Sequence, residues 1–178
     1  MKPNNGFTLL EMMMTLAIVG ILLTVGVPSF KTLITNNRIT SQTNDFITDL
    51  SIARSEAVKR NVWMTVCTSN TKTGCTVSGW NQGWIVFTDV GKDGAVSTGD
   101  TILRVNTGFT GNTTLAISGF NNANYIQFLP NGTVTGVTQG DPTHPAKFTL
   151  CYSGYTGKDI IFTTTGRMSS SATTSTCP

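Results

Sequence analysis

Glu11 is a carboxylate inside an otherwise apolar stretch that runs from residue 7 to residue 30. An ionised carboxylate in hydrocarbon costs at least a few kcal/mol unless it is paired. A cut after Gly6 would create a free α-amino group at Phe7. In an assembly of several subunits, the amine of one subunit would then meet Glu11 of its neighbour and relieve the buried charge. The alternative is that Glu11 simply stays near the lipid headgroups.

The four cysteines form an even set without a CxxC pair: Cys67, Cys75, Cys151 and Cys177. With one histidine in the chain, the pattern favours two disulfides in an oxidising compartment over a metal site. Three connectivities are open. We favour Cys67 with Cys75, which brackets a turn-rich segment, and Cys151 with Cys177, which would pin the Ser/Thr-rich ending. In the chain-entropy model these loops contribute about 2.6 and 3.5 kcal/mol.

A short acidic segment superficially resembles a calcium-binding loop: Asp89, Asp93, Gly94 and Asp100. An EF-hand requires oxygen ligands at alternating positions in a loop between two helices. Here Gly91 occupies the third position, Lys92 places a cation in the loop, and the flanks resemble strands. The segment therefore favours a hairpin turn over bound calcium, and we assign no metal ligand.

Catalysis finds little support in the sequence. The single histidine, His144, lies in a turn-like stretch, Asp141–Pro145, with no nucleophile motif beside it. The spacing of Gly108, Gly111 and Gly119 follows no phosphate-binding pattern and is typical of turns. We expect no catalytic residue, no cofactor and no enzyme.

The amino-terminal segment predicts membrane insertion. After the leader Met1–Gly6, the apolar stretch would form a helix of about 30 Å, which matches a bilayer core. An ordinary secretory signal has its small-residue cleavage site after the apolar region, whereas Gly6 lies just before it. Cleavage between Gly6 and Phe7 would remove the leader and keep residues 7–30 as a transmembrane helix.

Residues 31–60 change to an amphipathic pattern. Apolar residues recur at helical spacing in one stripe: Ile39, Phe46, Leu50, Ala53 and Ala57. We expect this stripe to pack on a globular domain. Three cations near the end of the helix are interpreted first as charges that complement the helix dipole and second as partner contacts: Arg54, Lys59 and Arg60.

Residues 61–178 predict one antiparallel β domain. Seven short runs rich in β-branched and aromatic residues are separated by Gly, Asn, Asp or Pro, at residues 61–68, 83–89, 101–105, 113–118, 125–130, 147–152 and 159–165. The fold class is therefore α+β, with a long amino-terminal helix packed on one antiparallel sheet or a small two-sheet unit. The formal charge of +3 is spread without a run and does not by itself indicate nucleic-acid binding.

The residues Gly6-Phe7-Thr8-Leu9-Leu10-Glu11 resemble the leader-peptide motif of type IV prepilins. The resemblance implies that a membrane prepilin peptidase cuts after Gly6 and N-methylates Phe7, and that Glu11 is needed for assembly. Pro28 stands where such helices commonly carry a kink-forming proline, which removes a helical hydrogen bond.

The second half of the chain resembles the FimT/FimU and GspH group of minor pilins and pseudopilins. The similar segments are Trp80-Asn81-Gln82-Gly83-Trp84 with the following strand, Phe128-Leu129-Pro130-Asn131-Gly132, and Asp159–Thr163 followed by Gly166-Arg167. The cysteine pair just ahead of Trp80, Cys67 and Cys75, is more similar to the pilus subgroup than to the type II secretion pseudopilins.

The resemblance implies a minor type IV pilin that helps initiate or cap a pilus. Its expected partners are other major and minor pilins, the prepilin peptidase, an inner-membrane assembly platform and membrane lipid. We expect a single-pass inner-membrane protein with a periplasmic carboxyl-terminal domain, which is also present in the pilus fibre. Two alternatives stay open: a type II secretion pseudopilin, and a minor pilin that binds DNA. Some relatives bind DNA through Gly-Arg-x-Arg, but this chain has Met168-Ser169 after Arg167, so nucleic acid is not favoured.

Overall fold

The structure is a computed structural model that describes residues 6–137 and 145–177, without the side chains of residues 174–176. The chain divides between Asn37 and Arg38 into two compact units. A single helix, α1 (Leu9–Arg60), contributes residues to both units.

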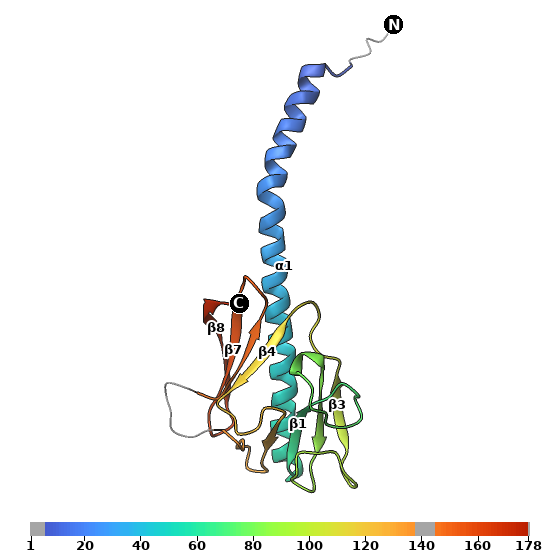
Figure 1. Ribbon diagram of the computed structural model, residues 1–178, viewed down its shortest axis with the longest axis vertical. Helices are drawn as coiled ribbons and strands as arrows, with labels where there is room; N and C mark the ends of the chain where they lie inside the picture. Colours follow the sequence, from blue (N-terminus) through green and yellow to red (C-terminus); the bar gives the residue numbers. More distant parts are fainter. Residues whose placement is uncertain (1–5, 138–144, 178) are drawn as a thin grey trace. The chain divides into compact units, whose positions relative to one another are not determined.

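The carboxyl-terminal unit contains two four-stranded antiparallel sheets (Figure 1). Sheet 1 has the strand order β3-β2-β1-β5 and sheet 2 the order β4-β6-β7-β8. The elements are β1 (Met64–Thr68), the 3₁₀ helix η1 (Trp80–Gln82), β2 (Trp84–Thr88), β3 (Ile102–Asn106), β4 (Thr114–Ser118), β5 (Tyr125–Phe128), β6 (Lys147–Cys151), β7 (Thr156–Phe162) and β8 (Met168–Thr176). The expected α+β class is confirmed, in its two-sheet form.

The core forms where both sheets meet the last turns of α1. All five residues of the predicted stripe are at most 1% exposed. Phe46 is the central one: its ring lies 4.8 Å from that of Trp84 in sheet 1 and 5.0 Å from that of Phe148 in sheet 2, both edge-on. Edge-to-face aromatic packing of this kind adds to the free energy of hydrophobic burial. The helix therefore supplies the apolar surface that joins the two sheets.

The two central strands of sheet 1, β1 and β2, are buried on both faces. Every residue of β1 and β2 is buried, because a second small cluster around Cys67, Ile85 and Phe87 lies on the side opposite the helix. Cys75 and Val96 cover that cluster, and they come from the loops that follow β1 and β2. These two strands consequently have the continuous apolar pattern of doubly covered strands.

The predicted strands correspond to β1 through β7, with ends that differ by a few residues. The largest shifts are three residues: β1 begins at Met64 instead of Asn61, and β7 begins at Thr156 instead of Asp159. The last strand, β8, was not predicted as a strand. It pairs with β7 along the Ser/Thr-rich ending, from Phe162 opposite Met168 to Thr156 opposite Thr176.

Candidate assembly segment and functional surfaces

The residues around the expected cleavage site precede the helix. Gly6, Phe7 and Thr8 are exposed and non-helical, and α1 begins at Leu9. The Thr8 hydroxyl accepts a hydrogen bond of 3.3 Å from the backbone N–H of Glu11. Thr8 and Glu11 thus stand in the Thr-x-x-Glu arrangement of a capping box, which satisfies a free N–H group of the first helical turn. Glu11 therefore lies at the positive end of the helix dipole as well as inside an apolar segment.

The first unit exposes a continuous apolar surface. The large apolar side chains between Phe7 and Ile34 are all at least 46% exposed. This part of α1 is long and apolar enough to cross a membrane. So much apolar surface is not stable in water and requires lipid or other apolar helices around it.

Hydroxyl groups in this apolar segment bond to the helix itself. The side chains of Thr15 and Thr24 donate to the carbonyls of Met12 and Ile21, at 2.9 and 2.8 Å. Such back-bonding removes the need for an outside partner in hydrocarbon. Pro28 lies inside α1, and the helix continues through it. The kink expected there stays a prediction.

Asp49 joins the helix to sheet 1. Its carboxylate is buried, accepts a 2.9 Å hydrogen bond from the indole N–H of Trp84, and lies 2.7 Å from Nε of Arg104. The Asn106 amide donates to the same carboxylate at 3.3 Å. Sequence reasoning missed this residue. Its position between Phe46 and Ala53 on the apolar stripe was the available indication that it is buried.

Arg54 connects the helix to one turn from each sheet. Its Nε donates to the Gly132 carbonyl at 2.8 Å, and its terminal nitrogen donates to the Thr165 carbonyl at 2.9 Å. Gly132 follows β5 of sheet 1, and Thr165 lies in the turn between β7 and β8 of sheet 2. The interpretation of Arg54 as a helix-end charge was therefore wrong, because its guanidinium is bound to two carbonyls within the fold.

Two glycines make that three-way contact possible. Gly132 and Gly166 have φ of 79° and 76°, in the region that favours glycine. A Cβ added at Gly166 would approach the Gly132 carbonyl oxygen to 2.3 Å. The two turns that resemble the FimU and GspH group are thus in direct contact. We call Arg54, Gly132, Thr165 and Gly166 the Arg54 junction.

The other two helix-end cations form a local ion cluster. Arg60 and Lys59 both pair with Glu56. The hydrogen bond from Arg60 is the main cause that lowers the pKa of Glu56 below its ordinary value of 4.5. These charges are one helical turn from their partner, as expected for residues three and four apart.

Two lysines of sheet 2 are the candidates to join Arg167 in a DNA contact, Lys147 and Lys158, but they lie on opposite faces of the sheet. Arg167 is exposed, but Lys147 lies 2.9 Å from the Asp159 carboxylate in an ion pair. Lys158 shares one face of β7 with Ile160 and Phe162, because it lies two and four residues from them, so it stands on the opposite face of the sheet from Asp159. The second cation of the Gly-Arg-x-Arg pattern is replaced by Ser169, and Met168, at the variable position, packs against the core.

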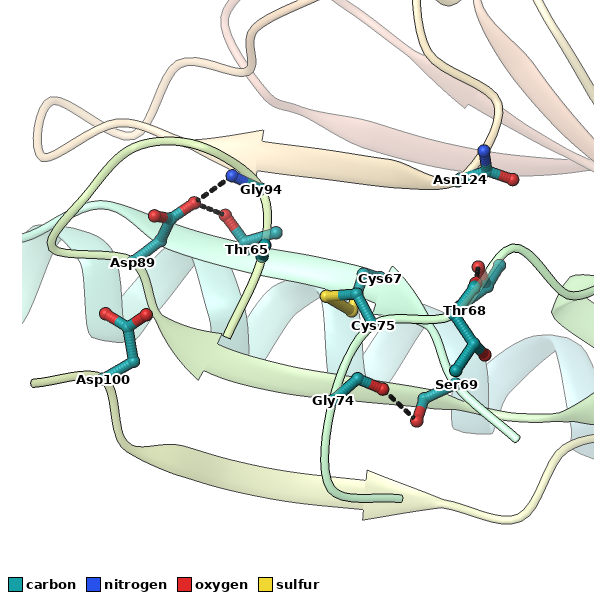
Figure 2. Close-up of a disulfide and its surroundings, with 12 residues drawn as sticks. Thr65, Cys67, Thr68, Ser69, Gly74, Cys75, Asp89, Gly94, Asp100 and Asn124 are labelled. Carbon is teal, nitrogen blue, oxygen red and sulfur yellow. Dashed lines mark hydrogen bonds between the residues drawn. A yellow bond between two sulfur atoms is a disulfide. The ribbon is translucent and has the colours of Figure 1, made fainter. Parts of the chain in front are cut away.

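The acidic segment uses its carboxylates to hold a loop together (Figure 2). Asp89 is buried and accepts from the Thr65 hydroxyl at 2.6 Å, the Gln127 amide at 2.8 Å and the Gly94 N–H at 3.0 Å. Asp100 accepts from the N–H groups of Val90 and Ser97, both at 2.8 Å. The carboxylates therefore organise the turn between β2 and β3.

The structure joins Cys67 to Cys75 and Cys151 to Cys177, which is the pairing that the sequence favoured. The first bond closes the loop after β1 (Figure 2), and the second ties the end of β8 to β6. His144 lies outside the described residues. Within residues 6–137 and 145–177, no group of three or more His, Cys, Asp and Glu side chains is placed to hold a metal ion.

Two family models match the sequence. The model of the type II transport protein GspH matches residues 42–166, which includes most of the two sheets and the Arg54 junction. The model of the prokaryotic N-terminal methylation motif matches residues 1–27, which includes Gly6, Phe7 and Glu11. No curated protein matches the sequence.

Two solved structures share the fold. Both are crystal structures of the type IV minor pilin FimU from Pseudomonas aeruginosa, in two crystal forms. The first is 22% identical, with a TM-score of 0.56, and the alignment covers 80% of this chain and 98% of that one. The second is 23% identical, with a TM-score of 0.53, and the alignment covers 76% and 98%. At this level of identity the likeness concerns the fold.

Proposed function

The chain belongs to the GspH family of type IV pilin-like proteins, and we propose that it is a minor type IV pilin that helps initiate or cap a pilus. In this proposal the prepilin peptidase cuts between Gly6 and Phe7 and methylates Phe7. The inner membrane then holds the subunit by residues 7–30, with the β domain in the periplasm, until the assembly platform moves it into the fibre beside other pilins.

The observation that carries the proposal is the exposed apolar helix with one carboxylate near its start. Lipid covers the apolar side chains equally well in a simple anchor, but a simple anchor supplies no cation to offset the cost of the Glu11 carboxylate in hydrocarbon. In a fibre, the amine of Phe7 from a neighbouring subunit supplies the missing positive charge. Pairing then favours one register between adjacent helices.

Substitution of Glu11 tests this role. We expect Glu11→Ala to insert into the membrane normally, because loss of a charge makes insertion easier, but to be depleted at least tenfold from sheared pili. Asp45→Ala is the matched control, since Asp45 is an exposed carboxylate on the same helix outside the apolar segment. Equal recovery of both variants in sheared pili would contradict the pairing. Mass spectrometry of the membrane-extracted protein should find a mature chain that begins with methylated Phe7.

A deletion strain separates the pilus role from a role in secretion. Surface pili, secreted type II substrates and transformation are measured side by side in the deletion strain and after complementation. We expect loss of pili with normal secretion. Loss of secretion with normal pili would assign the chain to the type II system instead.

A further inference from the structure

The two sheets present four edge strands in the described part of the chain, and three of them are protected. The outer side of β5 is occupied, because Phe128 bridges to Val134 and the Thr135 N–H donates to the Gln127 carbonyl at 2.9 Å. β3 is five residues long and pairs with β2 through a register shift, and β4 is equally short and lies against η1. Short, irregular or covered edges do not readily pair with other chains.

The fourth edge, β8, is the least protected, because its register shift with β7 lies beyond Ala172 and leaves Met168 to Ala172 regularly paired. It is nine residues long, with no charged residue and no proline. The Thr163 N–H donates to the Arg167 carbonyl at 3.0 Å, which fixes the phase of the β7–β8 ladder. In an antiparallel pair the bonded positions alternate, so a set of β8 residues directs its N–H and C=O groups away from β7: Met168, Ser170 and Ala172. Among residues 6–137 and 145–177, no backbone group pairs with them.

An apolar groove begins where this free edge begins. The groove has a volume of about 390 Å³ and is lined by Met168 and by one face of α1: Ser51, Arg54, Ser55, Val58 and Lys59. Val58 is 53% exposed although it follows the buried stripe. Cavities of this size accommodate side chains or small ligands. Met168 is both the first residue of the edge and one wall of the groove.

We propose that β8 and this groove form a strand-addition site. An extended segment of another protein pairs with Met168, Ser170 and Ala172 as a fifth strand of sheet 2 and places an apolar side chain over Val58. Only an extended backbone offers N–H and C=O groups at the spacing of this edge. Because β8 carries no charge, its backbone can pair with strands of many different sequences. The apolar groove therefore determines which partner strand binds.

The occupant is a different chain and not a second copy of this one. Two copies of β8 would bring only Ser, Thr and Ala side chains together beyond Met168. Such a pair would leave Val58 and the groove uncovered. A partner strand with large apolar residues at alternate positions covers both.

A random dodecapeptide library, displayed on phage and selected on the full chain in detergent micelles, tests the proposal. We expect enriched peptides with alternating apolar residues. The best of them, made synthetically, should bind Ser170→Pro and Val58→Asp at least tenfold more weakly than the unmodified chain. Ser170→Pro removes an outward N–H without breaking the β7 ladder. Val77→Asp, the same change at a valine that is 91% exposed, should bind normally. Hydrogen exchange at Ser170 and Ala172 should slow when the peptide binds.

Several results would overturn the proposal. They are failure to enrich any peptide, unchanged affinity in both edge and groove variants, or binding that leaves exchange at Ser170 and Ala172 fast. Self-association of the chain that Ser170→Pro abolishes would assign the edge to a second copy. If Ser170→Pro disturbs the hairpin, Val58→Asp decides by itself, because its side chain is already half exposed.

Discussion

Arg54 is the residue whose replacement should most clearly weaken the β domain without touching its apolar core. Arg54→Lys keeps the charge but cannot reach both carbonyls with one ammonium group, so we expect a loss of about 2 kcal/mol. Thermal unfolding followed by tryptophan fluorescence reports this unit, since Trp63, Trp80 and Trp84 all belong to it. Lys59→Met is the control, because that side chain is 77% exposed and should change stability by no more than about 0.5 kcal/mol. Equal stability of both variants would show that the junction is not energetically important.

Asp100 should make the loop between β2 and β3 sensitive to acid. Burial alone would raise its pKa, but the N–H groups of Val90 and Ser97 and the Ser97 hydroxyl lower the pKa below its ordinary value of 3.8. The unfolded chain takes up the proton at the ordinary pKa, while the folded chain stays ionised. The stabilisation is therefore complete above that value, declines as pH falls below it, and is lost below the folded pKa.

The difference between the chain and its Asp100→Asn variant isolates this contribution. We expect the variant to be about 1 kcal/mol less stable at neutral pH. Because the other carboxylates titrate in both proteins, the gap in unfolding temperature should stay constant above the ordinary pKa of 3.8 and close as the pH falls below it. A gap that stays constant below that pKa would contradict the proposed role of the Asp100 charge.

Single residues could be assigned from the sequence only when their partners were near in the chain. The stripe from Ile39 to Ala57 was evident from its spacing, and all its members are buried. The partners of Arg54 lie 78 and 111 positions away, so local pattern could not show them. Thr8 is an intermediate case, since its Thr-x-x-Glu spacing with Glu11 was readable as a cap.

At the scale of elements, β8 depends on its neighbours more than on its own sequence. Ser, Thr and Ala offer no alternation of apolar residues, so the ending gave no strand signal. The strand exists because β7 supplies a ladder and the bond between Cys151 and Cys177 holds its end. Strands β1 to β7 were predictable because their own sequences contain apolar alternation or apolar runs.

Removal of the carboxyl-terminal disulfide should release β8 before it affects the rest of the fold. We expect the paired variant Cys151→Ser with Cys177→Ser to lose about 3.5 kcal/mol in the chain-entropy model. Hydrogen exchange should accelerate first at Gly154 and at position 177, whose amides take part in backbone hydrogen bonds beside this disulfide. Loss of the smaller loop, by Cys67→Ser with Cys75→Ser, serves as the comparison and should leave those two amides slow. Exchange that accelerates equally in both variants would contradict a local role.

At the scale of the whole molecule, the two units should differ in the surroundings that they need: the first needs lipid or other apolar helices, and the second should fold in water. We expect a fragment that starts near Thr35 to fold in water and to lose stability under reduction, since every member of the main core lies beyond that residue. Cooperative unfolding of the oxidised fragment checks this. A molten or aggregated fragment would show that residues before Thr35 are required for folding.

The same fragment should bind duplex DNA only in the non-specific range, about 10⁻⁴ to 10⁻⁶ M at physiological salt. Arg167 is exposed, but Lys147 is paired and Lys158 lies on the other face of β7. Titration by fluorescence anisotropy should give similar affinities for the fragment and for its Met168→Ala variant. Nanomolar binding abolished by Arg167→Ala would favour DNA uptake as the function.

The Arg54 junction also limits how this sequence can diverge. A larger residue at position 166 collides with the Gly132 carbonyl, and a shorter one at position 54 leaves two turns without their common donor. A lineage that changes one of these positions should therefore carry a compensating change at another, although they are far apart in the chain. Positions 54, 132 and 166 are expected to co-vary among homologues, and to do so more strongly than position 167 beside them.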